Sequence, residues 1–208
     1  MVEFIKKKVH VQDPDASTTH KKGSGLERKP INVKETNLFF IGPRGSGKST
    51  VAEAVAARQD LPFVDTDSLI QEEAGLSIAQ IVQEQGWPAF RKLEAQALKE
   101  VCAGSGQVVA TGGGIVLDAD NRTLLREHGQ VFYLMADAPL LHQRLAAQDD
   151  ASLRPPLTDL EPAQELAETL AEREPLYFQT LHYILPANRQ LDELVQDVLE
   201  RLGQESDG

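Results

Sequence analysis

A glycine-rich stretch early in the chain has the residue types and spacing needed to hold a nucleoside triphosphate. Gly42–Ser49 reads GPRGSGKS, which fits the pattern G-x-x-x-x-G-K-[S/T]. Glycines in this pattern let backbone N–H groups surround phosphate oxygens. Lys48 can reach the β- and γ-phosphates, and the Ser49 hydroxyl can bind Mg²⁺. The apolar run Leu38–Ile41 before the motif predicts a buried strand, and the alanine-rich Val51–Arg58 after it predicts a helix. This context favours a phosphate-binding loop over a simple glycine turn.

Two carboxylates follow a second apolar segment, Leu61–Val64. Asp65 and Asp67 are spaced i, i+2, which in an extended chain points both side chains to one face. Ligands of open α/β sheets bind at the carboxyl ends of the strands, so we expect both acids near the phosphate loop. The structural alternative is that Asp67 or Thr66 is the N-cap of a helix that begins at Ser68.

Arg91 and Glu94 lie three residues apart on a predicted helix and therefore share a face. They form either an exposed ion pair of little energetic weight or a carboxylate-binding arginine held in place by a glutamate. The spacing alone favours the exposed ion pair.

A run of three glycines, Gly112 to Gly114, follows a third apolar segment, Gln107–Ala110. Such a run removes side chains, so that the backbone can approach a ligand closely. Further on, residues 148–161 are polar and contain a double proline, which predicts a loop too long to be only a connector. We interpret it as an active-site lid, with Arg154 as its sole cation.

Five apolar segments alternate with helical segments along the chain. This alternation predicts an α/β fold with a five-stranded parallel sheet and helices on both faces. We place it in one domain over residues 37–203. Between residues 68 and 103 we expect separate short helices, because Gly75 and Gly86 interrupt the pattern.

The charge is unevenly distributed over the 208 residues, whose formal net charge is −11. Residues 1–36 carry a net charge of +3 and lack a sustained period, so we expect a flexible basic tail, or alternatively an arm that contacts an acidic partner. We also expect residues 204–208 to be disordered. The acidic remainder argues against nucleic acid as a partner. The single cysteine, Cys102, excludes an internal disulfide and is expected to be a buried hydrophobe.

We expect no secretory signal, because no apolar segment follows the charged start of the sequence, and no apolar run reaches about 20 residues, the length that a membrane helix needs. We therefore expect a cytoplasmic protein that does not bind membranes. A monomer is the default expectation, because no exposed apolar stripe is evident beyond the needs of the core.

Over residues 37–202 the chain resembles the shikimate kinases, small phosphate-loop enzymes of aromatic amino-acid biosynthesis. Six blocks carry the resemblance: GPRGSGKST at 42–50, DTD at 65–67, FRxxE at 90–94, TGGG at 111–114, RP at 154–155 and RxPLY at 173–177. The resemblance implies a fold like that of nucleoside-monophosphate kinases, with a lid. It also implies transfer of the γ-phosphoryl group of ATP to the 3-hydroxyl of shikimate, with Mg²⁺, on the pathway to chorismate.

The resemblance also implies roles for the residues of the acceptor side, within substrate-binding helices over about 67–103. Asp67 would bind the reacting hydroxyl and act as a base. Arg91 and Arg173 would grip the shikimate carboxylate, and Glu94 would position that site. The backbone of Gly112, Gly113 and Gly114 would contact shikimate, mainly at Gly113.

On the nucleotide side, the resemblance implies that Ser49 and Asp65 hold Mg²⁺. Lys48 and the lid residue Arg154 would act on the phosphates and count as catalytic, with Asp67. The ATP-binding residues would be Gly45, Ser46, Gly47, Lys48, Ser49, Thr50, Arg144, Arg154, Arg189 and Gln190.

Two other functions compete with this interpretation. The first is a kinase for another small acceptor, such as gluconate or a nucleoside monophosphate. The second is a nucleotide-dependent binding or regulatory protein that has lost activity. The paired arginines and the glycine triplet favour an anionic cyclic acid over the first alternative, and the retained Asp67, Lys48 and Ser49 argue against the second.

Overall fold

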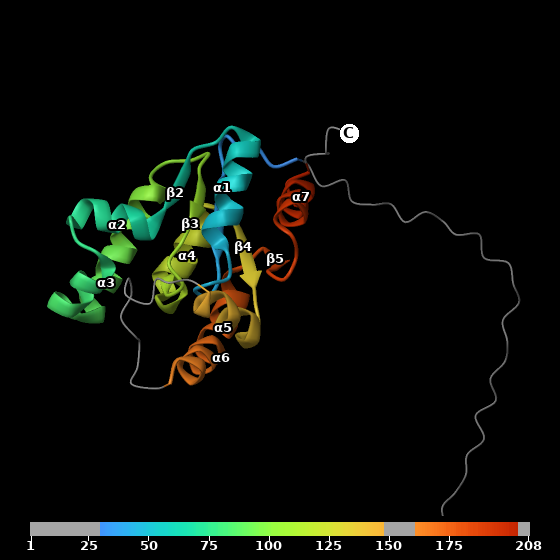
Figure 1. Cartoon of the computed structure of the whole chain (residues 1–208). Coiled ribbons are helices and arrows are strands. Elements are labelled where there is room, and N and C mark those ends of the chain that lie inside the picture. Colours follow the sequence, from blue (N-terminus) through green and yellow to red (C-terminus); the bar gives the residue numbers. More distant parts are fainter. Residues whose placement is uncertain (1–29, 148–160, 204–208) are drawn as a thin grey trace, which may run out of the picture.

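The computed structural model describes residues 30–147 and 161–203, and in this part the predicted sheet is present (Figure 1). Its strands are all parallel and lie in the order β2-β3-β1-β4-β5. Their bounds are β1 Asn37–Ile41, β2 Phe63–Asp65, β3 Val108–Ala110, β4 Gly129–Met135 and β5 Tyr183–Pro186. The strand order reverses around β1, so the loop that follows β1 lies at the crevice where such sheets bind ligands.

The helices lie close to the positions that the sequence predicts. They are α1 Lys48–Gln59, α2 Thr66–Ala74, α3 Ile78–Cys102, α4 Ala119–Glu127, α5 Ala138–Ala146, α6 Pro162–Thr180 and α7 Leu191–Arg201, with a short 3₁₀ helix, η1, at Ile115–Leu117. The sequence analysis missed η1, because three residues are too short to show a period.

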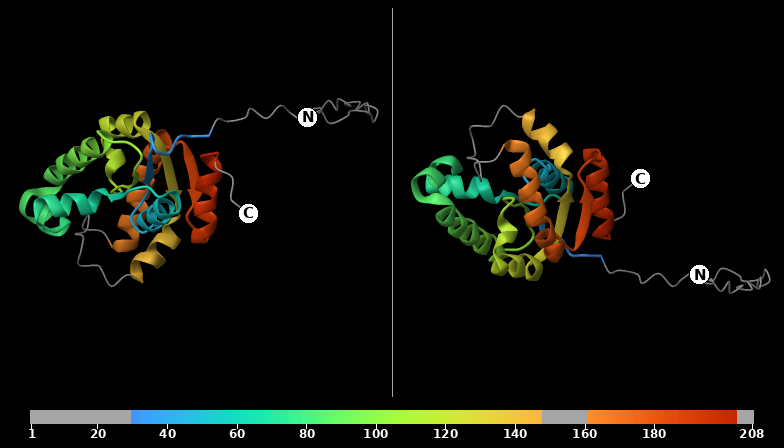
Figure 2. Two further views of the ribbon diagram at one scale, coloured as in Figure 1. Left: turned by 90° about the horizontal axis from the view of Figure 1, so that it is seen from above. Right: turned by 90° about the horizontal axis from the view of Figure 1, so that it is seen from below.

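The central strand β1 shows how the core is divided. Leu38 and Phe40 pack into one cluster with residues of α1 and α7, whereas Phe39 and Ile41 pack into another with residues of α3, α4 and α6. This alternation follows from the two-residue period of a strand. Seen from above and from below, the sheet has helices on both of its faces (Figure 2). Each fully buried leucine or phenylalanine contributes roughly 1.5–3 kcal/mol.

The helical region between β2 and β3 is interrupted at both predicted glycines. Gly75 ends α2 in a left-handed conformation, as expected. Gly86 has non-helical backbone angles, φ 78° and ψ 166°, so that α3 consists of two helical segments that meet at a kink. Pro88 occupies the first turn after the kink, where its missing N–H costs nothing. A small apolar cluster that includes Ile70 and Phe90 fixes α2 against α3.

The ordered domain begins earlier than residue 37, which corrects the boundary predicted for the tail. Ile31 donates a backbone hydrogen bond to Leu202 at 2.9 Å, and Val33 is buried in the core. These two apolar side chains anchor a segment that is otherwise polar. Residues 1–29, 148–160 and 204–208 lie outside the described part, and with them the predictions for the tail, the lid and Arg154. In the described part, no helix is long and apolar enough to cross a membrane.

Candidate active site

The phosphate loop connects β1 to α1, and its backbone is shaped to hold an anion. Gly45 and Gly47 have φ values of 80° and 98°, which side chains other than glycine rarely adopt. Gly47 is the N-cap of α1 and supplies no side-chain hydrogen bond to the helix start. Uncapped N–H groups and the positive end of the helix dipole together favour a bound phosphate. Lys48 is buried and donates from Nζ to the carbonyl of Pro43 at 2.9 Å, which keeps its charge over the loop.

Ser49 and Asp65 meet where α1 begins and β2 ends. The Ser49 hydroxyl donates to Oδ2 of Asp65 at 2.7 Å. Asp65 is also the N-cap of α2, since its Oδ1 accepts from the backbone N–H groups of Asp67 and Ser68 at 3.0 and 3.2 Å. The capping residue is therefore Asp65, not Thr66 or Asp67 as the structural alternative supposed.

This oxygen pair fits a magnesium ion. With its proton directed to Asp65, the Ser49 oxygen keeps lone pairs for a cation. Among the described residues, no group of three or more His, Cys, Asp or Glu side chains could hold a metal. Mg²⁺ usually takes one or two protein ligands and completes its shell with phosphate oxygens and waters, so the oxygens of Ser49 and Asp65 match its needs.

The glycine triplet after β3 lies against three different parts of the site. A Cβ atom on Gly112 would be 2.5 Å from Oε1 of Glu94 and 2.8 Å from Oδ1 of Asp67. A Cβ atom on Gly113 would contact the phosphate loop, 3.3 Å from the Gly42 carbonyl oxygen. A Cβ atom on Gly114 would overlap the guanidinium of Arg91. The missing side chains therefore allow two acids, an arginine and the phosphate loop to converge.

Asp67 reaches this point from a helix. It lies in the first turn of α2 and is 9% exposed. The argument from strand geometry is therefore wrong in detail, because Asp65 ends the strand and Asp67 belongs to the helix. Asp65 still contacts the phosphate loop, through Ser49, and Asp67 still lies beside Gly112 of the triplet. Both do so because the β2–α2 junction lies at the carboxyl edge of the sheet.

Arg91 and Glu94 form a mostly buried pair, contrary to what their spacing favoured. Nη1 of Arg91 lies 2.6 Å from Oε2 of Glu94, and the Glu94 side chain is 1% exposed. The Arg91 guanidinium also stands over the Trp87 ring, 5.2 Å from its centroid. Burial raises the pKa of Glu94, and the charges of Arg91 and Arg173 oppose that rise. Two cations from different helices thus surround one buried carboxylate.

Arg173 reaches the same region from α6. Its Nε is buried and has no hydrogen-bond partner in the described part of the chain. A buried cationic N–H group without a partner costs free energy unless a ligand accepts its hydrogen bond. With Arg91 close to the same glutamate, the site has two guanidinium groups suited to a carboxylate.

Arg144 connects two loops at the nucleotide side. From α5 it donates to the carbonyls of Ser46 and Ala187 at 2.8 and 2.7 Å. It therefore lies at the phosphate loop, and its contact with ATP stays a prediction.

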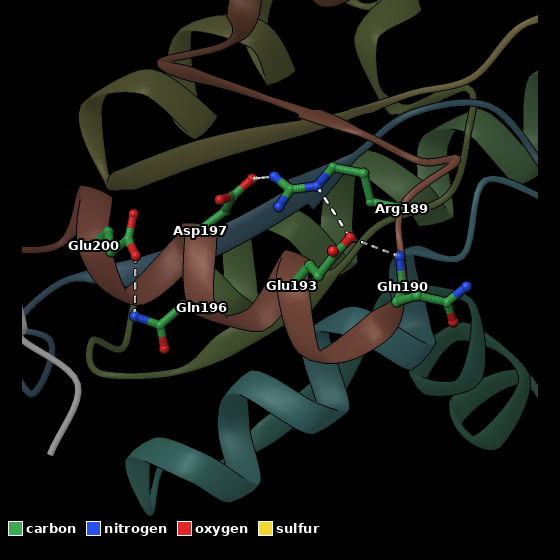
Figure 3. Close-up of polar contacts among 6 residues, drawn as sticks. All are labelled: Arg189, Gln190, Glu193, Gln196, Asp197 and Glu200. Carbon is green, nitrogen blue, oxygen red and sulfur yellow. Dashed lines mark hydrogen bonds and ion pairs between the residues drawn. The ribbon is translucent and has the colours of Figure 1, made fainter. Parts of the chain in front are cut away.

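Arg189 and Gln190 form polar contacts with residues of α7 (Figure 3). Arg189 pairs with Glu193 at 3.3 Å and with Asp197 further along the helix, and Gln190 forms a capping box with Glu193. Their contact with adenine stays a prediction.

Comparisons with known proteins agree with this geometry. The family model described as "Shikimate kinase" matches residues 44–203. The chain belongs to the shikimate kinase family. It is 43% identical over 168 residues to shikimate kinase 2 of Yersinia enterocolitica, covering 81% of this chain and 96% of that protein. It is 49% identical over 150 residues to shikimate kinase of Oleidesulfovibrio alaskensis, covering 72% of this chain and 87% of that protein.

Solved structures give the same result. A shikimate kinase from Acinetobacter baumannii in complex with shikimate matches with a TM-score of 0.75 and 34% identity, over 81% of this chain and 93% of that one. A gluconokinase from Sinorhizobium meliloti is 19% identical with a TM-score of 0.52, which shows a common fold only. The predicted fold and enzyme class are confirmed, and the function is that of the family, ATP-dependent phosphorylation of shikimate.

Two residues of the site were assigned no functional role from the sequence. The Thr66 hydroxyl accepts from the backbone N–H of Gly112 at 3.2 Å, and the Tyr177 hydroxyl donates to the carbonyl of Gly113 at 2.6 Å. The spacing of Arg173 and Tyr177, i and i+4 on a helix, places them on one face and could have indicated Tyr177. No comparable signal marks Thr66.

Proposed function

We propose that the γ-phosphoryl group of ATP passes to the 3-hydroxyl of shikimate between the phosphate loop and the glycine triplet. The observation that carries this proposal is the triplet itself. Gly113 packs on the phosphate loop, while Gly112 and Gly114 pack on the acids and on Arg91. One short segment thus brings a phosphate site and a carboxylate site together, which is the arrangement that transfer between two bound ligands needs.

On the acceptor side, Arg91 and Arg173 bind the carboxylate of shikimate with planar, paired hydrogen bonds. Glu94 keeps Arg91 in place through its 2.6 Å ion pair. An acceptor without a carboxylate would leave the buried Nε of Arg173 without a partner and Arg91 with Glu94 alone, so the site would reject it. Asp67, beside Gly112, orients the reacting hydroxyl and takes its proton late in the reaction.

On the nucleotide side, the N–H groups at the start of α1 and the Lys48 ammonium bind the phosphates. Phosphoryl transfer has a loose transition state with spread charge, so positioning and neutralisation do most of the catalytic work. Ser49 and Asp65 hold Mg²⁺, which when bound neutralises phosphate charge. Arg144, bonded to the Ser46 carbonyl, fixes the loop in its binding shape. We further expect the chain to act as a cytoplasmic monomer.

The test is ADP release by the full chain with ATP and Mg²⁺, with and without shikimate, followed by a coupled spectroscopic assay. We expect turnover that depends on shikimate and that gluconate or a nucleoside monophosphate does not support. Equal ADP release without shikimate, or better turnover with another acceptor, would refute the proposed acceptor site.

A further inference from the structure

The three carbonyl groups of the glycine triplet are all engaged by hydrogen bonds. The carbonyl of Gly112 accepts from the Ile115 N–H at 3.2 Å, and that of Gly114 accepts from the Leu117 N–H at 3.0 Å. Both bonds are local and belong to the turn into η1. The carbonyl of Gly113 accepts instead from the Tyr177 hydroxyl at 2.6 Å, across 64 residues of sequence. This long-range bond needs an explanation that the local turn does not provide.

The Tyr177 hydroxyl is held firmly in place. The side chain is completely buried and stacks on Tyr133 of β4, with ring centroids 4.9 Å apart and an interplanar angle of 20°. Burial raises the pKa of Tyr177, and Arg173 opposes this rise less strongly. The phenol therefore remains protonated and remains a hydrogen-bond donor at any physiological pH.

The bond to Gly113 determines where the next amide points. In a trans peptide, the C=O of one residue and the N–H of the following residue point in opposite directions. Between two glycines the peptide plane can rotate at little steric cost, so something else must set its orientation. Tyr177 binds the Gly113 carbonyl from the α6 side, which directs the Gly114 N–H away from α6. The Gly113–Gly114 peptide then presents its N–H on the side opposite to the Gly113 carbonyl.

We propose that Tyr177 is a positioning residue that fixes the Gly113–Gly114 peptide so that its N–H donates to an oxygen of the acceptor. This inference rests on the proposed acceptor site. It gives α6 two tasks, because Arg173 and Tyr177 lie one turn apart on the same face. Arg173 binds the anionic group, and Tyr177 orients the backbone donor beside it. Because the proposed bond is to the acceptor, we expect affinity for ATP to be insensitive to the hydroxyl.

The protein contains a matched control for the hydroxyl. Tyr133 is the stacking partner of Tyr177, is equally buried, and its Oη has no hydrogen-bond partner in the described part of the chain. The variants Tyr177→Phe and Tyr133→Phe each remove one buried oxygen from the same ring pair. Only the first removes a bond to the triplet.

The experiment measures KM for shikimate and for ATP, kcat, and direct shikimate binding by calorimetry for the wild type and both variants. For Tyr177→Phe we expect the KM and the dissociation constant for shikimate to rise about 10-fold, the effect of one lost hydrogen bond, while KM for ATP stays within about 2-fold. For Tyr133→Phe we expect both constants to be unchanged. A general loss of packing would instead affect both variants or both substrates.

Other results would overturn the inference. An unchanged shikimate constant in Tyr177→Phe, or a parallel rise in the ATP constant, would show that the hydroxyl has only a structural role. If the wild type itself fails to bind shikimate, the proposed acceptor site fails and this inference with it. A test on the unmodified chain covers the case in which Tyr177→Phe does not fold. In amide spectra of the glycine-labelled wild type, the Gly114 N–H resonance should shift when shikimate is added, and an unmoved resonance would refute the role.

Discussion

Replacing Gly112 with alanine tests whether the glycine triplet determines the positions of Glu94 and Asp67. The backbone of Gly112 has no positive φ, so the substitution adds one methyl group without backbone strain. That methyl carbon would lie 2.5 Å from Oε1 of Glu94 and 2.8 Å from Oδ1 of Asp67, whereas real Cβ atoms essentially never approach within 3.0 Å. Glu94 must therefore retreat by at least 0.5 Å and Asp67 by at least 0.2 Å, the differences from that limit.

The cost follows from how little these side chains can move. Glu94 is 1% exposed and paired with Arg91, and Asp67 is 9% exposed, so neither acid can swing into solvent. Overpacking at such sites costs about 1–3 kcal/mol, a factor of about 5–150. Displacing catalytic groups by fractions of an ångström adds to this loss. We expect kcat/KM for shikimate to fall about 10- to 100-fold, with KM for ATP changed by about 2-fold at most.

Gly104→Ala is the matched control, because its Cβ atom would lie 2.8 Å from Nε2 of Gln107 at the opposite end of β3. That amide can move, at the expense of its 3.2 Å hydrogen bond to the Val101 carbonyl. We expect a loss of about 1 kcal/mol in unfolding free energy with full activity. The assay is coupled ADP release with each substrate varied in turn, alongside urea unfolding of both variants. If Gly112→Ala keeps wild-type kcat/KM for shikimate, the acids are not constrained as described.

Three further predictions concern other parts of the molecule. Arg173→Lys should raise KM for shikimate about 10-fold or more, because lysine cannot make the paired contact, and leave KM for ATP unchanged; equal changes in both constants would contradict this. Asp67→Asn should keep both ligands bound in calorimetry yet lose most of kcat, and near-normal turnover would exclude a catalytic role. Burial, with a smaller contribution from Arg126, lowers the pKa of His182, whose Nδ1 accepts from the Val131 N–H at 3.0 Å. Because the unfolded chain then takes up the proton first, urea unfolding should show stability declining as pH falls below about 6.5, and less so in His182→Asn.

The sequence was sufficient to predict the elements whose signals are local. Leu38–Ile41 with the glycine loop that follows gave the central strand and the phosphate site, because strand composition and loop motif occur in one continuous run. The parallel sheet followed from the alternation of apolar and helical segments. The interruption at Gly86 was also predictable, because a glycine in a helical pattern marks a position where the helical geometry can break.

Whether two residues that share a helix face are buried together could not be predicted from the sequence. The spacing of Arg91 and Glu94 is the same for an exposed pair and a buried one. It does not show that Gly112 lies against Glu94 or that the charge of Arg173, on α6, reaches it. In the same way, the Tyr177–Gly113 hydrogen bond joins residues 64 positions apart, and no local sequence pattern predicts it. Contacts of this kind depend on how the helices pack on the sheet, which the sequence period constrains but does not specify.

The two hydrogen bonds of Arg144 have a consequence for motion in the unliganded protein. They link the loop after β1 to the loop after β5, across the edge of the sheet where a nucleotide would lie. Loops joined in this way fluctuate together, so amide exchange at Gly47 and at Asn188 should slow or quicken in parallel. The entropic cost of ordering these two loops is then part of the free energy of folding. A nucleotide therefore binds to loops that are already in position.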